Sequence, residues 1–316
     1  MYINNHADVV KVFWNSQLEF GKEDCFVEAI RRAYKDYMPR TMSRNKKGID
    51  KGEKITEVML DYVCDEKNFQ DGISFLDKIK DWFDKTSINQ KAYDEWHKEC
   101  CNKILQCFNE YYDNGVTYGK AQKIVNMTMK GIYCLAGAEK YEDWFKYCHM
   151  ALDSIILEWF KRDVVSSYNE KNKKENKIIT KMIDTWSNFD FGKDYTYTRE
   201  DKEYYGYEFY VDKIREYFSD SNNEIFNTFP ISDLTPFQAE FYIWRDMQLH
   251  TLTEILFSQE FGREERVDKV NTELEKIKVS KVDTFDKAKT KFKNFSLEKK
   301  LDIVEDAITL ITKEIN

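Results

Sequence analysis

Residues that interrupt helices are scarce in this sequence. Its 316 residues include only 11 glycines and 3 prolines, against roughly 7% and 5% in an average protein. Between these residues run long stretches in which apolar side chains recur at helical spacing, and we find no extended strand-like alternation. The sequence therefore predicts an all-α, multi-helix globular protein.

Long apolar runs and a signal peptide are also missing. No run approaches the roughly 18 uninterrupted apolar residues of a membrane span. Residues 1–19 lack a basic segment followed by an apolar core, which a secretory signal requires. We therefore expect a cytoplasmic protein without a membrane partner.

Paired cysteine spacings are absent as well. The seven cysteines are odd in number and lie mostly within helical patterns, which is typical of reduced, buried thiols. His97, Cys100, Cys101 and Cys107 lie along one expected helix, and a single helix cannot surround a tetrahedral ion. We expect neither a metal nor another cofactor.

Acidic residues are missing from Asn114 to Ala138, twenty-five residues in a chain with 57 acids and a net charge of −8. Three lysines lie inside this gap: Lys120, Lys123 and Lys130. At helical spacing they share one side with Asn126, while residues such as Ile124 and Ile132 fall on the other. The pattern predicts an apolar face for the core and a basic face for an anionic partner. The net charge argues against a surface that is basic throughout, but it allows a local basic groove.

Capping residues suggest where several helices begin. Ser87 is the expected cap of a helix that reaches Tyr112, and the central helix is expected from about Gly119 to Leu135. Asp153 is expected to cap the next helix or to lie in its first turn. Thr235-Pro236 is the expected start of a later one.

The expected organisation has three regions. Residues 1–113 form an N-terminal helical region, residues 114–220 the region that contains the acid-free segment, and residues 221–316 a C-terminal helical region. These regions are expected to pack as one or two domains.

Lys123 is the residue of the acid-free segment that we single out for chemistry. A lysine attacks an electrophilic carbon only when its amine is unprotonated. Cationic neighbours, a helix N-terminus and partial burial all favour that form. The alternative is a solvated basic stripe whose lysines interact with acids elsewhere on the protein.

A resemblance to a known family rests on two segments, QKIVNMTMKGIYCLAG and HMALDSIIL. Together they resemble the helix-hairpin-helix DNA glycosylase superfamily and, within it, the archaeal-type 8-oxoguanine glycosylases. The resemblance covers about 45 residues. It implies a nucleophilic Lys123, with Lys120 as the other candidate, and a catalytic aspartate, Asp153. It also implies a second lysine, Lys130, and hairpin glycines at Gly115 and Gly119.

The resemblance also implies a partner and its contacts. The partner would be double-stranded DNA, from which one damaged or modified base is flipped out and excised. In members with lyase activity, cleavage of the DNA strand follows the excision. The residues expected to contact DNA are Gly119, Lys120, Gln122, Asn126, Lys130 and His149. Those expected around the flipped base are Tyr118, Trp144 and Phe145. Such an activity would serve either DNA repair or defence against foreign, modified DNA.

Two other functions stay open. Arg245 and His250 form an Arg-x4-His pattern that resembles the catalytic motif of the HEPN ribonucleases, which would make RNA the substrate. The third possibility is an all-α interaction protein without catalysis, whose basic face binds an acidic partner.

Overall fold

A computed structural model describes residues 13–14, 18–22, 24–41, 55–112, 117–172, 176–191, 196–220, 224–225, 229–230, 234–244, 247 and 269. The chain divides into two compact units. The first contains Met1–Asn15, Glu224–Phe229 and Phe241–Asn316, and the second contains Ser16–Asn223 and Pro230–Glu240. The boundary expected near residue 113 lies inside the second unit. The boundary expected near residue 220 lies close to Asn223, where the first segment of that unit ends.

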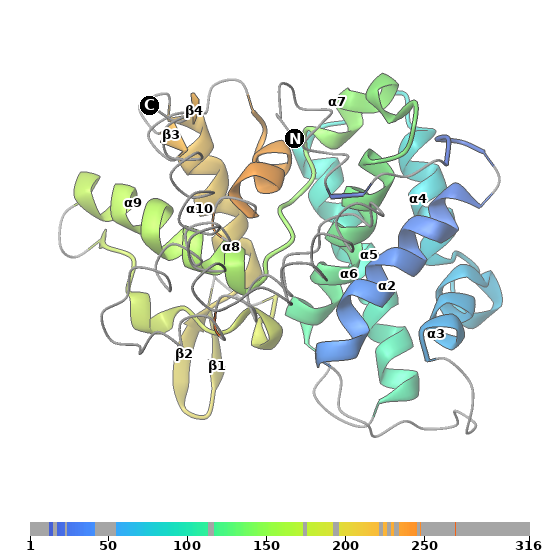
Figure 1. Cartoon of the computed structure of the whole chain (residues 1–316). Coiled ribbons are helices and arrows are strands. Elements are labelled where there is room, and N and C mark those ends of the chain that lie inside the picture. The colour runs from blue at the N-terminus through green and yellow to red at the C-terminus, as the bar shows by residue number, and fades with distance from the viewer. Residues whose placement is uncertain are drawn as a thin grey trace, which may run out of the picture. The chain divides into compact units, whose positions relative to one another are not determined.

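The described residues are mostly helical, in agreement with the composition (Figure 1). The α-helices are α2 (Cys25–Thr41), α3 (Ile55–Cys64), α4 (Phe75–Phe83), α5 (Gln90–Tyr111), α6 (Tyr118–Tyr133), α7 (Glu142–Phe145), α8 (Ser154–Trp159), α9 (Val165–Lys171) and α10 (Tyr207–Ser219). A π-helical stretch, Phe160–Val164, joins α8 to α9. Residues 236–244 are also helical. Within the described part of the chain, no helix is both long and apolar enough to span a bilayer.

Helix α6 is the central element of the second unit. It packs against α2 and α5, and of its 16 residues only Lys120 and Lys123 are not buried. Such a helix can be covered on nearly every side only because its polar side chains find partners inside the protein. The acid-free segment is therefore a core helix rather than an amphipathic surface helix.

Side-chain caps fix several helix starts. Thr117 caps α6 and Asp153 caps α8, so the predicted position of Asp153 is confirmed. Thr235 and Gln238 form the reciprocal capping box expected at the start of the helical residues 236–244. The prediction for Ser87 was wrong, because Asn89 caps α5 by accepting a hydrogen bond from the Ala92 N–H.

A small β-hairpin departs from the all-helical expectation. Strands β1 (Thr196–Arg199) and β2 (Lys202–Tyr205) pair antiparallel, and a second two-stranded sheet joins β3 (Glu224–Ile225) to β4 (Phe229–Pro230). The β1–β2 turn consists of Glu200 and Asp201, both with positive φ. A two-residue turn of this kind usually carries Asn-Gly or Asp-Gly, so the sequence lacked the usual hairpin signal.

Candidate active site

Lys123 and Asp153 are thirty residues apart in sequence but form a direct ion pair. The distance between Lys123 Nζ and Asp153 Oδ2 is 2.7 Å. The two side chains are 13% and 15% exposed, so the pair is sheltered by protein while part of it still reaches solvent. The structure thus brings together the two residues for which the sequence suggested a chemical role.

Local structure fixes both members of the pair. Lys123 lies in the second turn of α6. Asp153 is the N-cap of α8, where Oδ1 accepts a hydrogen bond from the Ile156 N–H at 2.9 Å. Oδ1 of Asp153 therefore caps α8, and Oδ2 accepts the hydrogen bond from Lys123.

The charges of the pair depend on one another. Burial alone would raise the pKa of Asp153, but the Lys123 ammonium and the Ile156 N–H outweigh burial and bring this pKa below its usual range. At neutral pH, Asp153 is consequently a carboxylate. Burial lowers the pKa of the nearby Lys120, which favours an unprotonated amine at the other lysine of this helix end.

The prediction that Gln122, Asn126 and Lys130 face a DNA-binding groove was wrong for this structure. These residues are 0%, 1% and 2% exposed. They lie at i, i+4 and i+8 and so form one buried polar stripe along α6. Helical periodicity placed Asn126 and Lys130 on a solvent-facing side, and the resemblance added Gln122. Neither takes account of the fact that a polar side chain can be buried when it is hydrogen-bonded within the protein.

The partners of this stripe explain its burial. The Lys130 ammonium pairs with the Glu240 carboxylate at 2.7 Å, and both side chains are 2% exposed. The Asn126 amide donates to the main-chain oxygen of Met150 at 3.0 Å, and Gln122 bonds both main-chain polar groups of Leu152. The stripe therefore holds the segment that leads to Asp153.

Gly119 packs against protein rather than presenting its main chain to a phosphate. Its N–H donates to the main-chain oxygen of Phe189 at 2.9 Å. Thr117, two residues earlier, donates through its hydroxyl to the main-chain oxygen of Ser187 at 2.6 Å. The expectation that Gly119 contacts DNA is therefore corrected. A glycine is needed here because a loop of the protein approaches α6 closely.

Substitution of Gly119 by alanine should destabilise the protein strongly. A Cβ at this position would lie 1.8 Å from the main-chain oxygen of Trp186, which cannot move without displacing the loop. We expect a loss of about 3 kcal/mol in the free energy of unfolding, the upper part of the range for overpacking. Urea denaturation measures it. Gln70→Ala, an exposed change in the turn before α4, should stay within about 0.5 kcal/mol. Equal stability of Gly119→Ala and the wild type would contradict the close approach.

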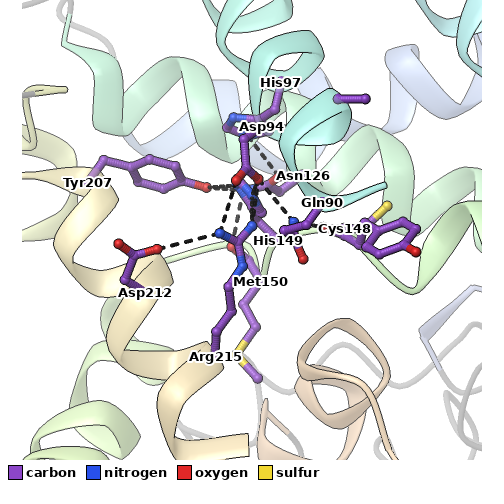
Figure 2. Close-up of polar contacts among 12 residues, drawn as sticks. Gln90, Asp94, His97, Asn126, Cys148, His149, Met150, Tyr207, Asp212 and Arg215 are labelled. Carbon is purple, nitrogen blue, oxygen red and sulfur yellow. Dashed lines mark hydrogen bonds and ion pairs between the residues drawn. The ribbon is translucent and has the colours of Figure 1, made fainter. Parts of the chain in front are cut away.

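His149 belongs to a buried polar network and not to a DNA-facing surface (Figure 2). Its Nε2 lies 2.8 Å from Asp94 Oδ1 and its Nδ1 lies 3.0 Å from the Tyr207 hydroxyl. Arg215 binds Asp94 through both terminal nitrogens, at 2.5 and 3.1 Å. Burial lowers the pKa of His149 despite the hydrogen bond to Asp94, so the imidazole is neutral at pH 7. The expected contact between His149 and DNA is corrected accordingly.

Two neighbours of His149 Nε2 have opposite hydrogen-bonding roles. Asp94 Oδ1 accepts and lies 2.8 Å from Nε2, whereas Arg215 Nη2 donates and also lies 2.8 Å from it. On the other side of the ring, the Tyr207 hydroxyl accepts from the Asn126 amide at 3.1 Å and contacts His149 Nδ1. This chain links α10 and α5 to the middle of α6. Asp94, Tyr207 and Arg215 were not anticipated, since partners up to 121 residues apart leave no local sequence pattern.

Tyr118 is the one residue expected around a flipped base that lines a described cavity. This cavity of about 210 Å³ is also bordered by Asp94, His97, Tyr207 and Arg215. Neither it nor the neighbouring cavity of about 120 Å³ includes Lys123 or Asp153 in its wall. The structure therefore does not place Tyr118 beside the ion pair.

Phe145 and Trp144 take structural positions, which corrects the expectation that they surround a base. Phe145 is 1% exposed and stacks on Phe237 with ring centroids 5.9 Å apart. Trp144 packs edge-on against Tyr141 at 5.5 Å. Phe145 therefore packs in the core, and Trp144 is a half-buried residue beside Tyr141.

Three other predicted residues, Gly115, Arg245 and His250, lie outside the described residues. Among the described residues, no group of three or more His, Cys, Asp or Glu side chains is arranged to hold a metal ion.

Comparison of the chain with protein families, curated proteins and solved structures gave no match.

Proposed function

We propose that this protein is a DNA glycosylase in which Lys123 is the nucleophile and Asp153 its partner, with an abasic-site lyase step open to it through the imine. The observation that carries the proposal is the 2.7 Å contact between these two side chains. The resemblance to the glycosylases assigns a nucleophile and an aspartate to these two positions, which are distant in sequence.

The geometry of the pair allows the proton transfer with which such a reaction begins. The ammonium must lose a proton before it can attack, and Asp153 Oδ2 lies within proton-transfer distance of it. The neutral amine then forms a bond to C1′ of the deoxyribose while the bond from C1′ to the base breaks and its electron pair leaves with the base. The proton returns from Asp153 to the departing base. The C1′–O4′ bond then breaks as C1′ and the Lys123 nitrogen form a protonated imine, and one proton of that nitrogen moves to O4′.

Partial burial of the Lys123 and Asp153 side chains also supports the proposal. A carboxylate stabilises positive charge on the sugar more strongly where water is largely excluded. The remaining exposure of the two side chains leaves a route by which an extruded nucleotide could approach, since the reacting carbon is inaccessible in stacked DNA.

Trapping of the imine tests the proposal. Wild-type protein incubated with borohydride and duplexes that carry various modified bases should form a stable covalent adduct, because borohydride reduces the imine to an amine. Peptide mapping by mass spectrometry should place the adduct at Lys123.

A duplex with a pre-formed abasic site provides the positive control, because its aldehyde needs no base excision before it reacts. If only the abasic duplex gives an adduct, the protein carries out the lyase reaction, and the base that it excises is not among the modified bases tried. If no duplex gives an adduct, the abasic one included, then Lys123 is only one half of a structural ion pair and the proposal fails.

A further inference from the structure

Gln122 and Leu152 directly precede the two members of the ion pair in sequence. Gln122 is followed by Lys123, and Leu152 is followed by Asp153. The Gln122 side chain donates from Nε2 to the Leu152 main-chain oxygen at 2.8 Å and accepts at Oε1 from the Leu152 N–H at 3.3 Å. One amide therefore joins the two chain segments immediately beside the pair.

The segment from Met150 to Leu152 depends on side chains for its main-chain hydrogen bonds. It belongs to no helix or strand and is buried, so its polar groups must be satisfied within the protein. Asn126 bonds the Met150 oxygen, Glu240 accepts from the Ala151 N–H at 2.7 Å, and Gln122 bonds Leu152. In place of a neighbouring strand, side chains set the position of this segment along α6.

Two of these contacts are themselves held in place. The Gln122 amide also donates to the Gly119 oxygen and accepts from Asn126, both at 2.9 Å. Glu240 is neutralised by Lys130. Because the rotamers of these side chains are fixed by further bonds, the segment has little freedom to slide along the helix.

We infer that Gln122 is a positioning residue that sets the register between Lys123 and Asp153. The inference rests on the proposed glycosylase function for its catalytic consequence. Gln122 is itself fully buried and so does not touch a substrate. A displacement of about 1 Å in a reacting group can cost on the order of 10²-fold in rate, so loss of this clamp should slow the chemistry without weakening DNA binding.

Gln122→Glu tests this role through pH. A protonated carboxyl has the same shape as the amide and can both accept from the Leu152 N–H and donate to the Leu152 oxygen. The ionised form would instead direct a negative oxygen at two main-chain oxygens, those of Leu152 and Gly119. Burial raises the pKa of a carboxyl by up to several units, so the variant should change between these forms in an accessible pH range.

The expected result is a ratio of trapping rates, variant over wild type, that depends on pH. We expect the variant to be at least about 10-fold slower at high pH and to approach the wild type as pH falls, with duplex affinity unchanged throughout. Gln70→Glu provides a matched control, since it makes the same chemical change at an exposed site in the turn before α4 and should follow the wild type at every pH.

Gln122→Met, which removes the clamp at similar volume, gives a reading that does not depend on activity. With the register lost, the pKa of Asp153 measured by carboxyl NMR titration should rise toward its ordinary value. A wild-type rate in Gln122→Glu, a ratio independent of pH, or an unchanged Asp153 pKa in Gln122→Met would overturn this inference alone. Failure of the wild type to form any adduct would overturn the proposed function, and with it the catalytic role of Gln122.

Discussion

Replacement of Lys123 by arginine is expected to abolish adduct formation while leaving the fold intact. Arginine keeps a positive charge that can pair with Asp153, but a guanidinium is not deprotonated under these conditions and forms no imine with C1′. Trapping should fall by roughly 10⁴-fold or more, the scale seen when an enzyme loses its nucleophile. Gel analysis of borohydride-treated mixtures, with the abasic duplex as substrate, measures the loss.

Lys123→Ala should lose trapping equally, but at a greater cost in stability. It leaves the sheltered Asp153 carboxylate without its counter-ion, and an uncompensated charge of this kind is destabilising. Comparison of the two variants therefore shows which effects come from the positive charge at position 123 and which come from the nucleophilic amine. Equal loss of trapping with different stabilities is the pattern expected of a nucleophile.

Lys120→Ala distinguishes the two lysines. Lys120 is also only partly buried, and burial lowers its pKa, so its amine is the competing candidate. We expect this variant to retain trapping within about threefold of the wild type, because the contact with Asp153 belongs to Lys123. Loss of the adduct in Lys120→Ala together with its survival in Lys123→Arg would transfer the role to Lys120.

The helical character and several helix starts could be predicted because their causes are local. The scarcity of glycine and proline, the apolar periodicity and capping side chains such as Asp153 and Thr235 act over a few residues. The β1–β2 turn was missed for the same reason, since Glu200 and Asp201 do not have the usual composition of a hairpin turn.

The environment of the site could not be predicted because its causes are distant in sequence. Burial of Lys130 depends on Glu240, 110 residues away, and burial of Asn126 depends on Tyr207, 81 residues away. Without these partners a polar stripe on a helix is indistinguishable from a solvated face. Lys123 was singled out from the acid-free segment, but only the resemblance suggested Asp153 as its partner, because helical periodicity does not connect residues thirty positions apart.

The second large effect is expected for Asp153→Asn. Asparagine is also a good helix cap, so it should still accept from the Ile156 N–H and α8 should form. It cannot take the Lys123 proton or carry negative charge beside the sugar. With a duplex that bears a susceptible base, trapping should slow by at least about 10²-fold, as is typical when a positioned acid–base group is lost.

The abasic duplex should reveal which step depends on Asp153. An abasic aldehyde reacts with an amine without a departing base, so charge stabilisation on the sugar contributes less to its capture. Asp153→Asn should therefore lose more activity on the base-bearing duplex than on the abasic one, when both rates are normalised to the wild type. Glu158→Gln, an exposed change on the same helix, should alter neither rate. Equal losses on the two duplexes would mean that Asp153 serves the lysine alone, as its base and counter-ion, and has no part in expelling the nucleobase.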